Sequence, residues 1–286
     1  MQRGVVLVIV LWIIALLAVM AGGFAYSMRI ETRLATSAVD RAQARALAEA
    51  GIAYALVWQL DPELPQQWPP NGDERDWTFG GARLRIRTID ASGLVNLNTA
   101  EPELLKALLA AAGLDARDQD RLAAAIQEQR NPTEQGKLDA GSHTAIQGMR
   151  SGPSRFESIE DLQQVPGMIP VIYAQLAGLV TVFSEHRGVN PELAPVPMLR
   201  ALGLDERAAA DYVETRTRAA VSGQPPPPLS AGGNPFLFSQ GKASVYHVAA
   251  AAETATGATA TIEAVIDGRR TAAGQLPRLL AWRDGH

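Results

Sequence analysis

The side chains best suited to catalysis are few and scattered in this sequence. It has no cysteine and four histidines: His143, His186, His247 and His286. None of these stands in a His-Glu-x-x-His pattern, and no Gly-x-Ser-x-Gly pattern offers a nucleophilic serine. Adjacent carboxylates such as Glu160 and Asp161 stand at a predicted helix start, where the helix dipole accounts for them. The sequence therefore nominates no catalytic residue, and we expect neither an enzyme nor a cofactor.

One acid and one histidine have a spacing that metal ligands can use. Asp139 and His143 are four residues apart, inside a polar, Gly- and Ser-rich stretch from Asn131 to Arg155. Such composition predicts a loop, which has no helical periodicity to hold the two side chains together. A histidine near an acid in a loop is usually solvated, so the pair indicates no metal site. Whether the loops bind a cation is left open.

Three arginines alternate with apolar residues between Ala82 and Asp90. Leu84 and Ile86 are separated by Arg83, Arg85 and Arg87, which is the period-two pattern of a strand with one buried face. The arginines could bind phosphate, but they are explained more simply as the solvated face of a half-buried strand. We therefore predict a strand at 82–90.

The longest apolar stretch of the chain lies at its N-terminus. Val5–Tyr26 contains no charged residue, and about 20 apolar residues suffice to cross a bilayer core of roughly 30 Å. A cleaved secretory signal would have a shorter apolar region followed by small residues, which Ala18, Ala21, Gly22 and Gly23 could imitate. A plain signal anchor and a membrane helix that continues into the folded protein are the alternatives.

The residues after the apolar stretch favour a continuing helix. No proline occurs between Ser27 and Pro62, and Ile30, Leu34 and Ala38 recur every four residues among charged side chains. One helix from Val5 to Leu60 would be about 84 Å long at roughly 1.5 Å per residue. Its first half would be apolar all round and its second half amphipathic.

This N-terminus resembles the type IV pilin and pseudopilin family. Arg3-Gly4 matches the basic-Gly site that prepilin peptidase cleaves, and the apolar helix starts at Val5. The resemblance implies cleavage between Gly4 and Val5 and methylation of the new N-terminus on Val5. Most members carry Glu as the fifth mature residue, whereas this chain has Ile9 there. Absence of that Glu is characteristic of the minor pseudopilin K family of type II secretion, which the chain resembles over nearly its whole length.

The family resemblance implies an α+β fold. A pilin-like long N-terminal helix would pack on an antiparallel sheet that carries a large all-α helical-hairpin insertion. The implied segments are a leader peptide (1–4), a transmembrane helix (5–26), its periplasmic continuation (27–60), a pilin-like α/β domain (61–93 and 236–286) and a helical insertion domain (94–235).

The sequence suggests further strands for this sheet. Lys242–Ala252 and Ala258–Gly268 are β-rich runs joined across a short Gly-containing turn, which predicts an antiparallel hairpin. Leu279–Trp282 is expected to add an edge strand, and Leu179–Phe183 is expected in the same sheet. Asp61–Asp76 contains four prolines and an Asn-Gly pair, so we predict a linker there.

The middle of the chain contains two related helical hairpins. Gly93–Arg130 predicts two helices joined at Gly113, with a helix N-cap at Asn98-Thr99. Gly188–Arg216 repeats this pattern about 90 residues later, with Asn190 in the place of Asn96. Between them, Ser158 and Asp161 predict a capping box, and Val165-Pro166-Gly167 predicts a turn between two short helices. Repetition at this spacing indicates a module built from related hairpins.

Helix-hairpin-helix modules of this kind often bind DNA, which gives an alternative from another functional class. Phosphate binding depends on Lys and Arg, yet residues 95–235 contain 12 basic and 17 acidic side chains, a net charge of −5. The whole chain has a net charge of −4, which does not indicate a general nucleic-acid surface. We therefore expect no nucleic-acid partner.

The resemblance implies a structural role. The chain would cap the tip of the type II secretion pseudopilus, prime its assembly and support export of folded proteins across the outer membrane. Its implied partners are minor pseudopilins I and J, other pseudopilus subunits, prepilin peptidase and the inner-membrane secretion platform. It would be a single-pass inner-membrane protein with its C-terminal domain in the periplasm. The alternatives are a membrane-tethered DNA-uptake receptor and, with no residues to nominate, a tethered hydrolase.

Overall fold

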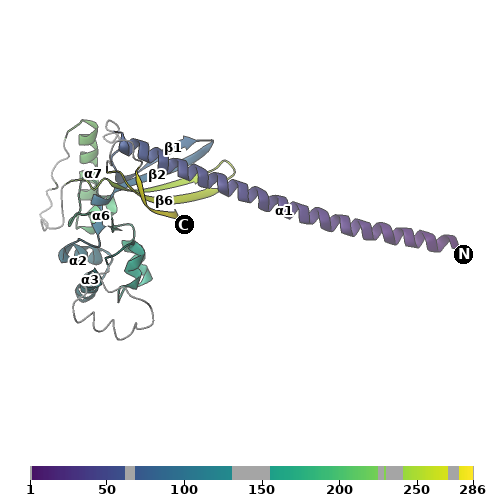
Figure 1. The fold of residues 1–286 in the computed structure, drawn as a ribbon, viewed down its shortest axis with the longest axis horizontal. Helices are drawn as coiled ribbons and strands as arrows, with labels where there is room; N and C mark the ends of the chain where they lie inside the picture. Colours follow the sequence, from purple (N-terminus) through teal and green to yellow (C-terminus); the bar gives the residue numbers. More distant parts are fainter. Residues whose placement is uncertain are drawn as a thin grey trace.

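One helix dominates the shape of the protein. The computed structural model describes residues 2–61, 68–130, 155–224, 229, 241–269 and 277–285. Helix α1 runs without a break from Gln2 to Leu60, and its N-terminal part projects far from the rest of the protein (Figure 1). We call the described residues after α1 the head. The prediction of one helix that continues from the apolar stretch into the head is confirmed.

A five-stranded antiparallel sheet forms the part of the head that packs on α1. Its strands lie in the order β1-β2-β5-β6-β7. Their bounds are Asn71–Phe79 (β1), Ala82–Asp90 (β2), Val245–Glu253 (β5), Thr259–Asp267 (β6) and Arg278–Gly285 (β7). Neighbouring strands pair antiparallel throughout. The predicted strand at 82–90, the predicted hairpin and the predicted edge strand near the C-terminus are therefore confirmed, as is the α+β class.

Two predictions about the sheet are wrong. The predicted linker Asp61–Asp76 includes the first residues of β1, because the Asn71-Gly72 pair lies in an irregularity of the β1–β2 register rather than in a turn that ends the strand. Leu179–Phe183 contains only the short strand β4 (Val180–Thr181), which pairs in parallel with β3 (Val95–Asn96) in a separate two-stranded sheet. A 3-10 helix, η1 (Ala91–Gly93), turns the chain away from the large sheet before β3 begins. Part of the predicted linker, 62–67, lies outside the described residues.

The C-terminal part of α1 buries one face against the sheet. Ala48, Ile52 and Ala55 share a hydrophobic core with side chains of β2, β5 and β6. Gly51 faces the sheet closely, because a Cβ atom there would come 2.9 Å from the Cβ of Ala250. The alternation of buried and exposed residues along β2 supplies the other half of this core. An amphipathic helix and a one-sided sheet bury their apolar faces together, as expected for a two-layer fold.

A mainly helical segment lies between the neighbouring strands β2 and β5. It contains α2 (Pro102–Ala111), α3 (Ala116–Arg130), η2 (Ile159–Gln164), α5 (Pro170–Leu176), α6 (Val196–Ala201) and α7 (Glu206–Val221). These helices surround a second hydrophobic core, which includes Leu104, Leu108, Ile126 and Leu199. The segment also contains η1 and the β3–β4 sheet. The description of this segment as all-α is therefore too simple.

The two predicted helical hairpins have the same local geometry. The α2–α3 turn places Gly113 at a φ of 85°, and the α6–α7 turn places Gly203 at 97°, a conformation that glycine adopts without strain. The following aspartates cap α3 and α7: Asp115 accepts from the backbone N–H of Asp118, and Asp205 accepts from that of Ala208, both at 2.8 Å. The predicted repeat is confirmed in these turns.

The connections before the helices differ in part from the prediction. Asn98 does not cap α2, whose N-cap is Glu101; instead the Asn98 side chain binds the backbone N–H and C=O of Phe156. The predicted capping box of Ser158 and Asp161 is present, although it starts the 3-10 helix η2. The pair Asp139 and His143 lies outside the described residues.

Candidate functional site: the membrane helix and its junctions with the head

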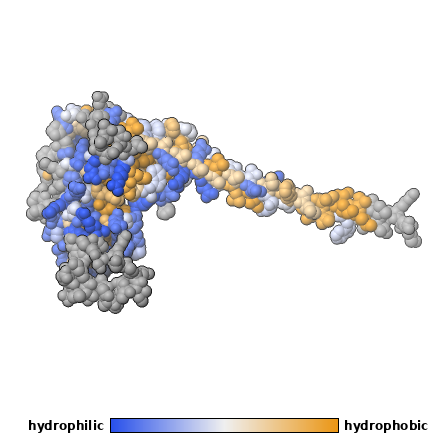
Figure 2. Space-filling model, viewed as in Figure 1, coloured by the Kyte–Doolittle hydropathy of each residue, from blue (hydrophilic) through white to orange (hydrophobic). Residues whose placement is uncertain are grey.

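The first half of α1 has the length and composition of a membrane span. An 18-residue window in the helix has a mean hydropathy of 2.3, and none of it is buried within the protein. Trp12 and Phe24 are 74% and 69% exposed, and Figure 2 shows hydrophobic residues gathered along this end of the molecule. Apolar side chains exposed on all sides of a helix require a nonaqueous environment or a partner.

The three residues that the sequence nominated lie in the first turns of this helix. Gly4 and Val5 are helical, within Gln2–Leu60. Ile9 has a 53% exposed side chain on the projecting part of α1, so none of the described residues of the head covers it. Cleavage at Gly4, methylation of Val5 and the role of the missing carboxylate at Ile9 stay predictions.

The second half of α1 is exposed until it meets the sheet. Val39 is 65% exposed, whereas Ala44 is fully buried. At this boundary Arg45 donates from Nη1 to Asp284 of β7 at 2.6 Å and from Nε to Glu49 at 3.2 Å. The hydrogen bond and charge of Asp284 raise the pKa of the Arg45 guanidinium above its ordinary value. This exposed ion pair joins the last strand to the helix where the helix leaves the head.

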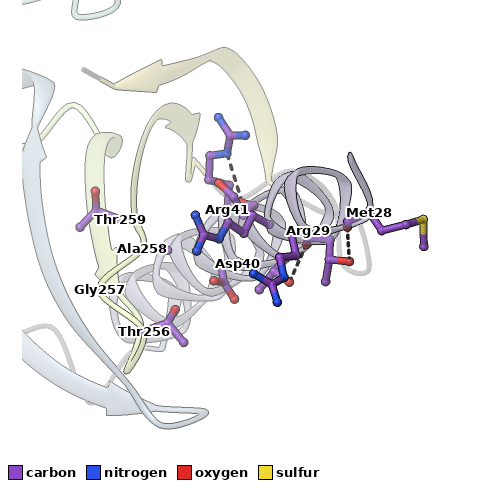
Figure 3. Close-up of a pocket in the computed structure, with 12 residues that line it drawn as sticks. Met28, Arg29, Asp40, Arg41, Thr256, Gly257, Ala258 and Thr259 are labelled. Carbon is purple, nitrogen blue, oxygen red and sulfur yellow. Dashed lines mark hydrogen bonds between the residues drawn. The ribbon is translucent and has the colours of Figure 1, made fainter. Parts of the chain in front are cut away.

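A groove lies on α1 just before this boundary. It has a volume of about 860 Å³ and lies between one face of the helix and the β5–β6 turn. Figure 3 shows the side chains of α1 on one side of this groove and the turn Thr256–Thr259 on the other. The groove residues are Met28, Arg29, Thr32, Arg33, Thr36, Ser37, Asp40, Arg41 and Thr256–Thr259.

A second junction connects the helical segment to the other face of the sheet. A cavity of about 220 Å³ lies between them, lined by Tyr173 and Val180 on one side and His247 and Arg283 on the other. The His247 Nε2 atom lies 2.9 Å from Thr181 Oγ1. Burial, with a smaller effect of the Arg283 guanidinium, lowers the pKa of His247 to about 4. Arg283 itself pairs with Glu160 of η2 and with Glu263 of β6.

Asp90 connects both ends of the helical segment to the sheet. Its carboxylate accepts hydrogen bonds from the backbone N–H and the hydroxyl of Ser92, where the chain leaves the sheet. It also accepts from the backbone N–H groups of Ala243 and Ser244, each at 2.9 Å, where the chain returns. The residue is fully buried. Four donors on one carboxylate satisfy a buried charge that would otherwise be costly.

Comparisons with known proteins connect this geometry to a family. Residues 82–185, from β2 to just after β4, match the sequence profile of "Type II secretion system (T2SS), protein K". The fold matches a chain in "The Crystal Structure of the GspK-GspI-GspJ complex from enterotoxigenic Escherichia coli Type 2 Secretion System" at a TM-score of 0.55. The match covers 91% of this chain and 99% of that chain, with 15% sequence identity. No curated protein sequence matches the chain.

Residues 82–185, a little more than a third of the length of the chain, are similar to the type II secretion system protein K family. The matched residues include Asp90, Asn96 and the β3–β4 pair, so the family profile covers the point at which the helical segment leaves the sheet. The family resemblance on which the sequence interpretation depended is therefore confirmed. The pseudopilin family is structural rather than enzymatic.

Two buried arginines, Arg130 and Arg216, were not identified from the sequence. Arg130 Nη1 donates to the carbonyl oxygens of Leu97 and Ala100. Arg216 Nη1 makes the equivalent bonds in the second hairpin, to Pro191 and Ala194, both at 2.7 Å. Burial lowers the pKa of both guanidinium groups from their ordinary values. Arg130 is the last residue of α3, whereas Arg216 lies inside α7. The sequence gives no shared spacing for them, and an arginine in a helix is usually assigned to the surface.

Proposed function

We propose that this protein is a minor pseudopilin that caps the tip of the type II secretion pseudopilus and primes its assembly. The observation that carries the proposal is the family match over 82–185, joined to a helix whose exposed apolar half has membrane-spanning length. The proposed placement is a single-pass inner-membrane anchor with the head in the periplasm. From this position the protein would support export of folded proteins across the outer membrane.

The proposed partners are minor pseudopilins I and J, other pseudopilus subunits and the inner-membrane secretion platform. In support, the structurally similar chain belongs to a complex of GspK, GspI and GspJ. The long exposed surface of α1 offers apolar side chains to neighbouring helices of an assembled shaft, and association between membrane helices depends on such packing. Exposure from Ile9 to Val39 is consistent with a surface that partners cover.

The proposed tip position follows from the shape of the subunit. The head extends to one side of the end of α1 and is much wider than the helix (Figure 1), so a further subunit could not continue the shaft past it without a clash. The proposed processing leaves Val5 as a methylated N-terminus after prepilin peptidase cleaves at Gly4. Ile9 then replaces the usual carboxylate, which in other subunits would need a partner inside the membrane.

We also propose that the head is two units. The pilin-like unit would comprise 61–93 and 236–286, and the helical insertion would comprise 94–235. Two separate hydrophobic cores support this division, one shared by α1 and the sheet and the other by the helices between β2 and β5. Asp90, which binds backbone donors on both connecting segments, would fix the insertion relative to the sheet.

DNA uptake is not favoured by the hairpin turns. A helix N-terminus attracts phosphate through its free N–H groups, but at the start of α3 the Asp115 carboxylate already accepts from one of them. Asp205 does the same at the start of α7. The first turns also carry Asp118 and Glu206. Negative charge at both turns would repel a phosphate backbone.

The proposed function can be tested by partner binding and by location. The full chain is expressed with the minor pseudopilins I and J of its own organism, solubilised from membranes and purified through a C-terminal tag. We expect both partners to copurify and duplex DNA to be left unbound. A gold label on the tag is expected at one end of each pseudopilus. Labels along the whole shaft would contradict capping, and DNA binding without I and J would support the rival function.

A further inference from the structure

The groove between α1 and the β5–β6 turn combines positive charge with a position near the membrane. Its helical wall carries three arginines, Arg29, Arg33 and Arg41, and one acid, Asp40. Its other wall, Thr256–Thr259, has no charged side chain. The groove therefore has a formal charge of +2, from three arginines and one aspartate, within a chain whose net charge is −4.

The two arginines nearest the apolar stretch lack a carboxylate partner among the described residues. Arg45, one turn beyond Arg41, pairs with Glu49 and Asp284, but no ion pair of Arg29 or Arg33 is present in the described part of the chain. The nearby acid Glu31 lies about 160–200° around the helix from both, at roughly 100° per residue. The positive charge of Arg29 and Arg33 is therefore directed to one face of α1.

This face begins at the depth of lipid headgroups. The apolar stretch ends at Tyr26, and the headgroup layer extends about 5–8 Å beyond the hydrocarbon core on each side. At about 1.5 Å per residue, Arg29 lies roughly 4–5 Å past Tyr26 and Arg33 roughly 10 Å past it. Arginine side chains can extend back toward the interface, so both guanidinium groups reach the headgroup phosphates.

We propose that this groove binds the phosphate groups of anionic phospholipids and thereby tilts the head toward the membrane. The inference depends on the proposed membrane anchoring of α1. Membrane helices tilt by about 20° on average. Because the β5–β6 turn and both arginines lie on the same side of α1, lipid binding on this side brings the turn toward the bilayer.

A carboxylate-rich protein segment is the other chemistry that such a groove could hold. Phospholipid is favoured because Arg29 and Arg33 lie within a few ångströms of the membrane surface before any partner binds. Charge complementarity with anionic headgroups acts at that distance, and basic residues next to a membrane each contribute about 1 kcal/mol of attraction, which corresponds to roughly fivefold in affinity.

The first experiment measures lipid selectivity. The full chain is reconstituted in phosphatidylcholine nanodiscs that contain a trace of spin-labelled phosphatidylglycerol or spin-labelled phosphatidylcholine. We expect the protein to immobilise the anionic lipid preferentially and high salt to weaken this preference. The double variant Arg29→Gln/Arg33→Gln is expected to lose it by severalfold, up to roughly fivefold per arginine. The control Arg117→Gln/Arg121→Gln removes the same charge from exposed positions on α3 and is expected to keep the preference.

The second experiment measures the position of the turn. The chain has no cysteine, so Ala255→Cys provides one labelling site on the exposed tip of the hairpin. A fluorophore there is expected to be quenched by headgroup-attached quenchers in discs containing phosphatidylglycerol, and less so in the Arg29→Gln/Arg33→Gln background. Equal quenching in both backgrounds would contradict the proposed tilt.

The outcomes separate this inference from the proposed function. A protein that inserts in the discs but shows no preference for phosphatidylglycerol would overturn the lipid site and leave the anchor in place. A protein that does not insert at all would overturn both. Protection of the labelled turn by minor pseudopilins I and J, with no dependence on the lipid, would assign the groove to a protein partner instead.

Discussion

At the residue scale, the head depends on a few buried or part-buried polar groups whose partners come from distant segments. Asp90 binds donors 153 and 154 residues away, and His247 meets Thr181 across the junction between the helical segment and the sheet. Such groups are costly to bury alone but specify one arrangement when all their partners are present. Each should therefore have a larger effect on stability than exposed residues of the same type.

Arg216 gives the first prediction. Arg216→Met keeps most of the volume but removes the bonds to the carbonyl oxygens of Pro191 and Ala194. One buried and one part-buried carbonyl lose their donor, which costs about 1–3 kcal/mol for a buried group and less for a part-buried one. We therefore expect a loss of roughly 2–4 kcal/mol in the free energy of unfolding. Urea denaturation followed by tryptophan fluorescence measures it. Arg218→Met, two residues away on the exposed side of α7, is the control and is expected to change stability by less than about 0.5 kcal/mol.

His247 gives a prediction about pH. Its pKa is lowered to about 4 in the folded protein, whereas an unfolded histidine has a pKa of about 6.5. Between these values the unfolded chain binds a proton that the folded chain does not. The free energy of unfolding should therefore decrease as the pH falls from about 6.5 to 4. Above pH 6.5 the titration of His247 should cause no change of stability with pH. Its contribution is at most about 3–4 kcal/mol, from a pKa difference of about 2.5 at roughly 1.36 kcal/mol per pKa unit.

A comparison with His247→Gln isolates this effect from the carboxylates that also titrate in acid. The glutamine can still bond to Thr181 but does not titrate. The free energy of unfolding of the wild type, minus that of the variant, should decrease as the pH falls from 6.5 to 4. Parallel stability curves for the two proteins across that window would show that His247 is not held neutral by the fold.

At the element scale, the close packing of α1 on the sheet depends on one glycine. In Gly51→Ala the new methyl group would lie 2.9 Å from the Ala250 Cβ and 3.2 Å from Leu84 Cδ2. We expect the clash to outweigh the gain of about 1 kcal/mol in helix propensity and to destabilise the protein by roughly 1–2 kcal/mol net. Thermal unfolding of the purified variants measures this change.

Moving the methyl group across the interface tests the same contact. Ala250→Gly opens the space that Gly51→Ala fills, so the double variant should be more stable than the sum of the two single changes predicts, by about 1 kcal/mol. Ala53→Gly, on the exposed side of α1, reports the helix-propensity effect alone. Strict additivity of the Gly51 and Ala250 changes would mean that the helix and sheet adjust freely at this position.

Elements with strong local periodicity were predictable from the sequence. The continuous helix α1, the alternating strand β2 and the β5–β6 hairpin all follow from patterns within a single segment. β1 was missed because its first residues, Pro-flanked Asn71-Gly72, have the composition of a turn, and only pairing with β2 makes them a strand. The parallel pairing of β3 with β4 joins residues 85 apart, such as Val95 and Val180, and two-residue strands leave no periodic signal.

In the candidate site, too, the sequence predicts the features that depend on one segment and misses those that depend on distant contacts. The membrane span could be predicted because it depends on composition alone. The Gly4–Val5 site depends on a local motif and stays a prediction. The groove, the cavity at His247 and the partners of Asp90 depend on contacts between segments far apart in the chain. The arginine strip at Arg83, Arg85 and Arg87 is exposed on β2, which agrees with its interpretation as the solvated face of a strand.

At the scale of the whole molecule, the position of proteolytic cleavage determines whether the mature protein keeps its membrane span. A cut after Gly4 removes a short leader and keeps the apolar part of α1 attached to the head. A cut near Ala21–Gly23, as a secretory signal would have, releases a head without a membrane span. The second product would be unsuited to stacking, because it would lack the exposed apolar residues from Ile9 to Met20.

Two glycine substitutions distinguish these possibilities in the full chain coexpressed with prepilin peptidase. Gly4→Ala is expected to block processing, so that intact mass and N-terminal sequencing show the complete leader. Gly22→Ala is the control: a Cβ there meets no atom within 4 Å, and the chain is expected to be cut normally before Val5 and to stay in the membrane. If Gly4→Ala were processed normally and Gly22→Ala were not, cleavage would lie after the apolar stretch. The head would then be released, and the anchored, stackable subunit that the proposed tip position requires would not exist.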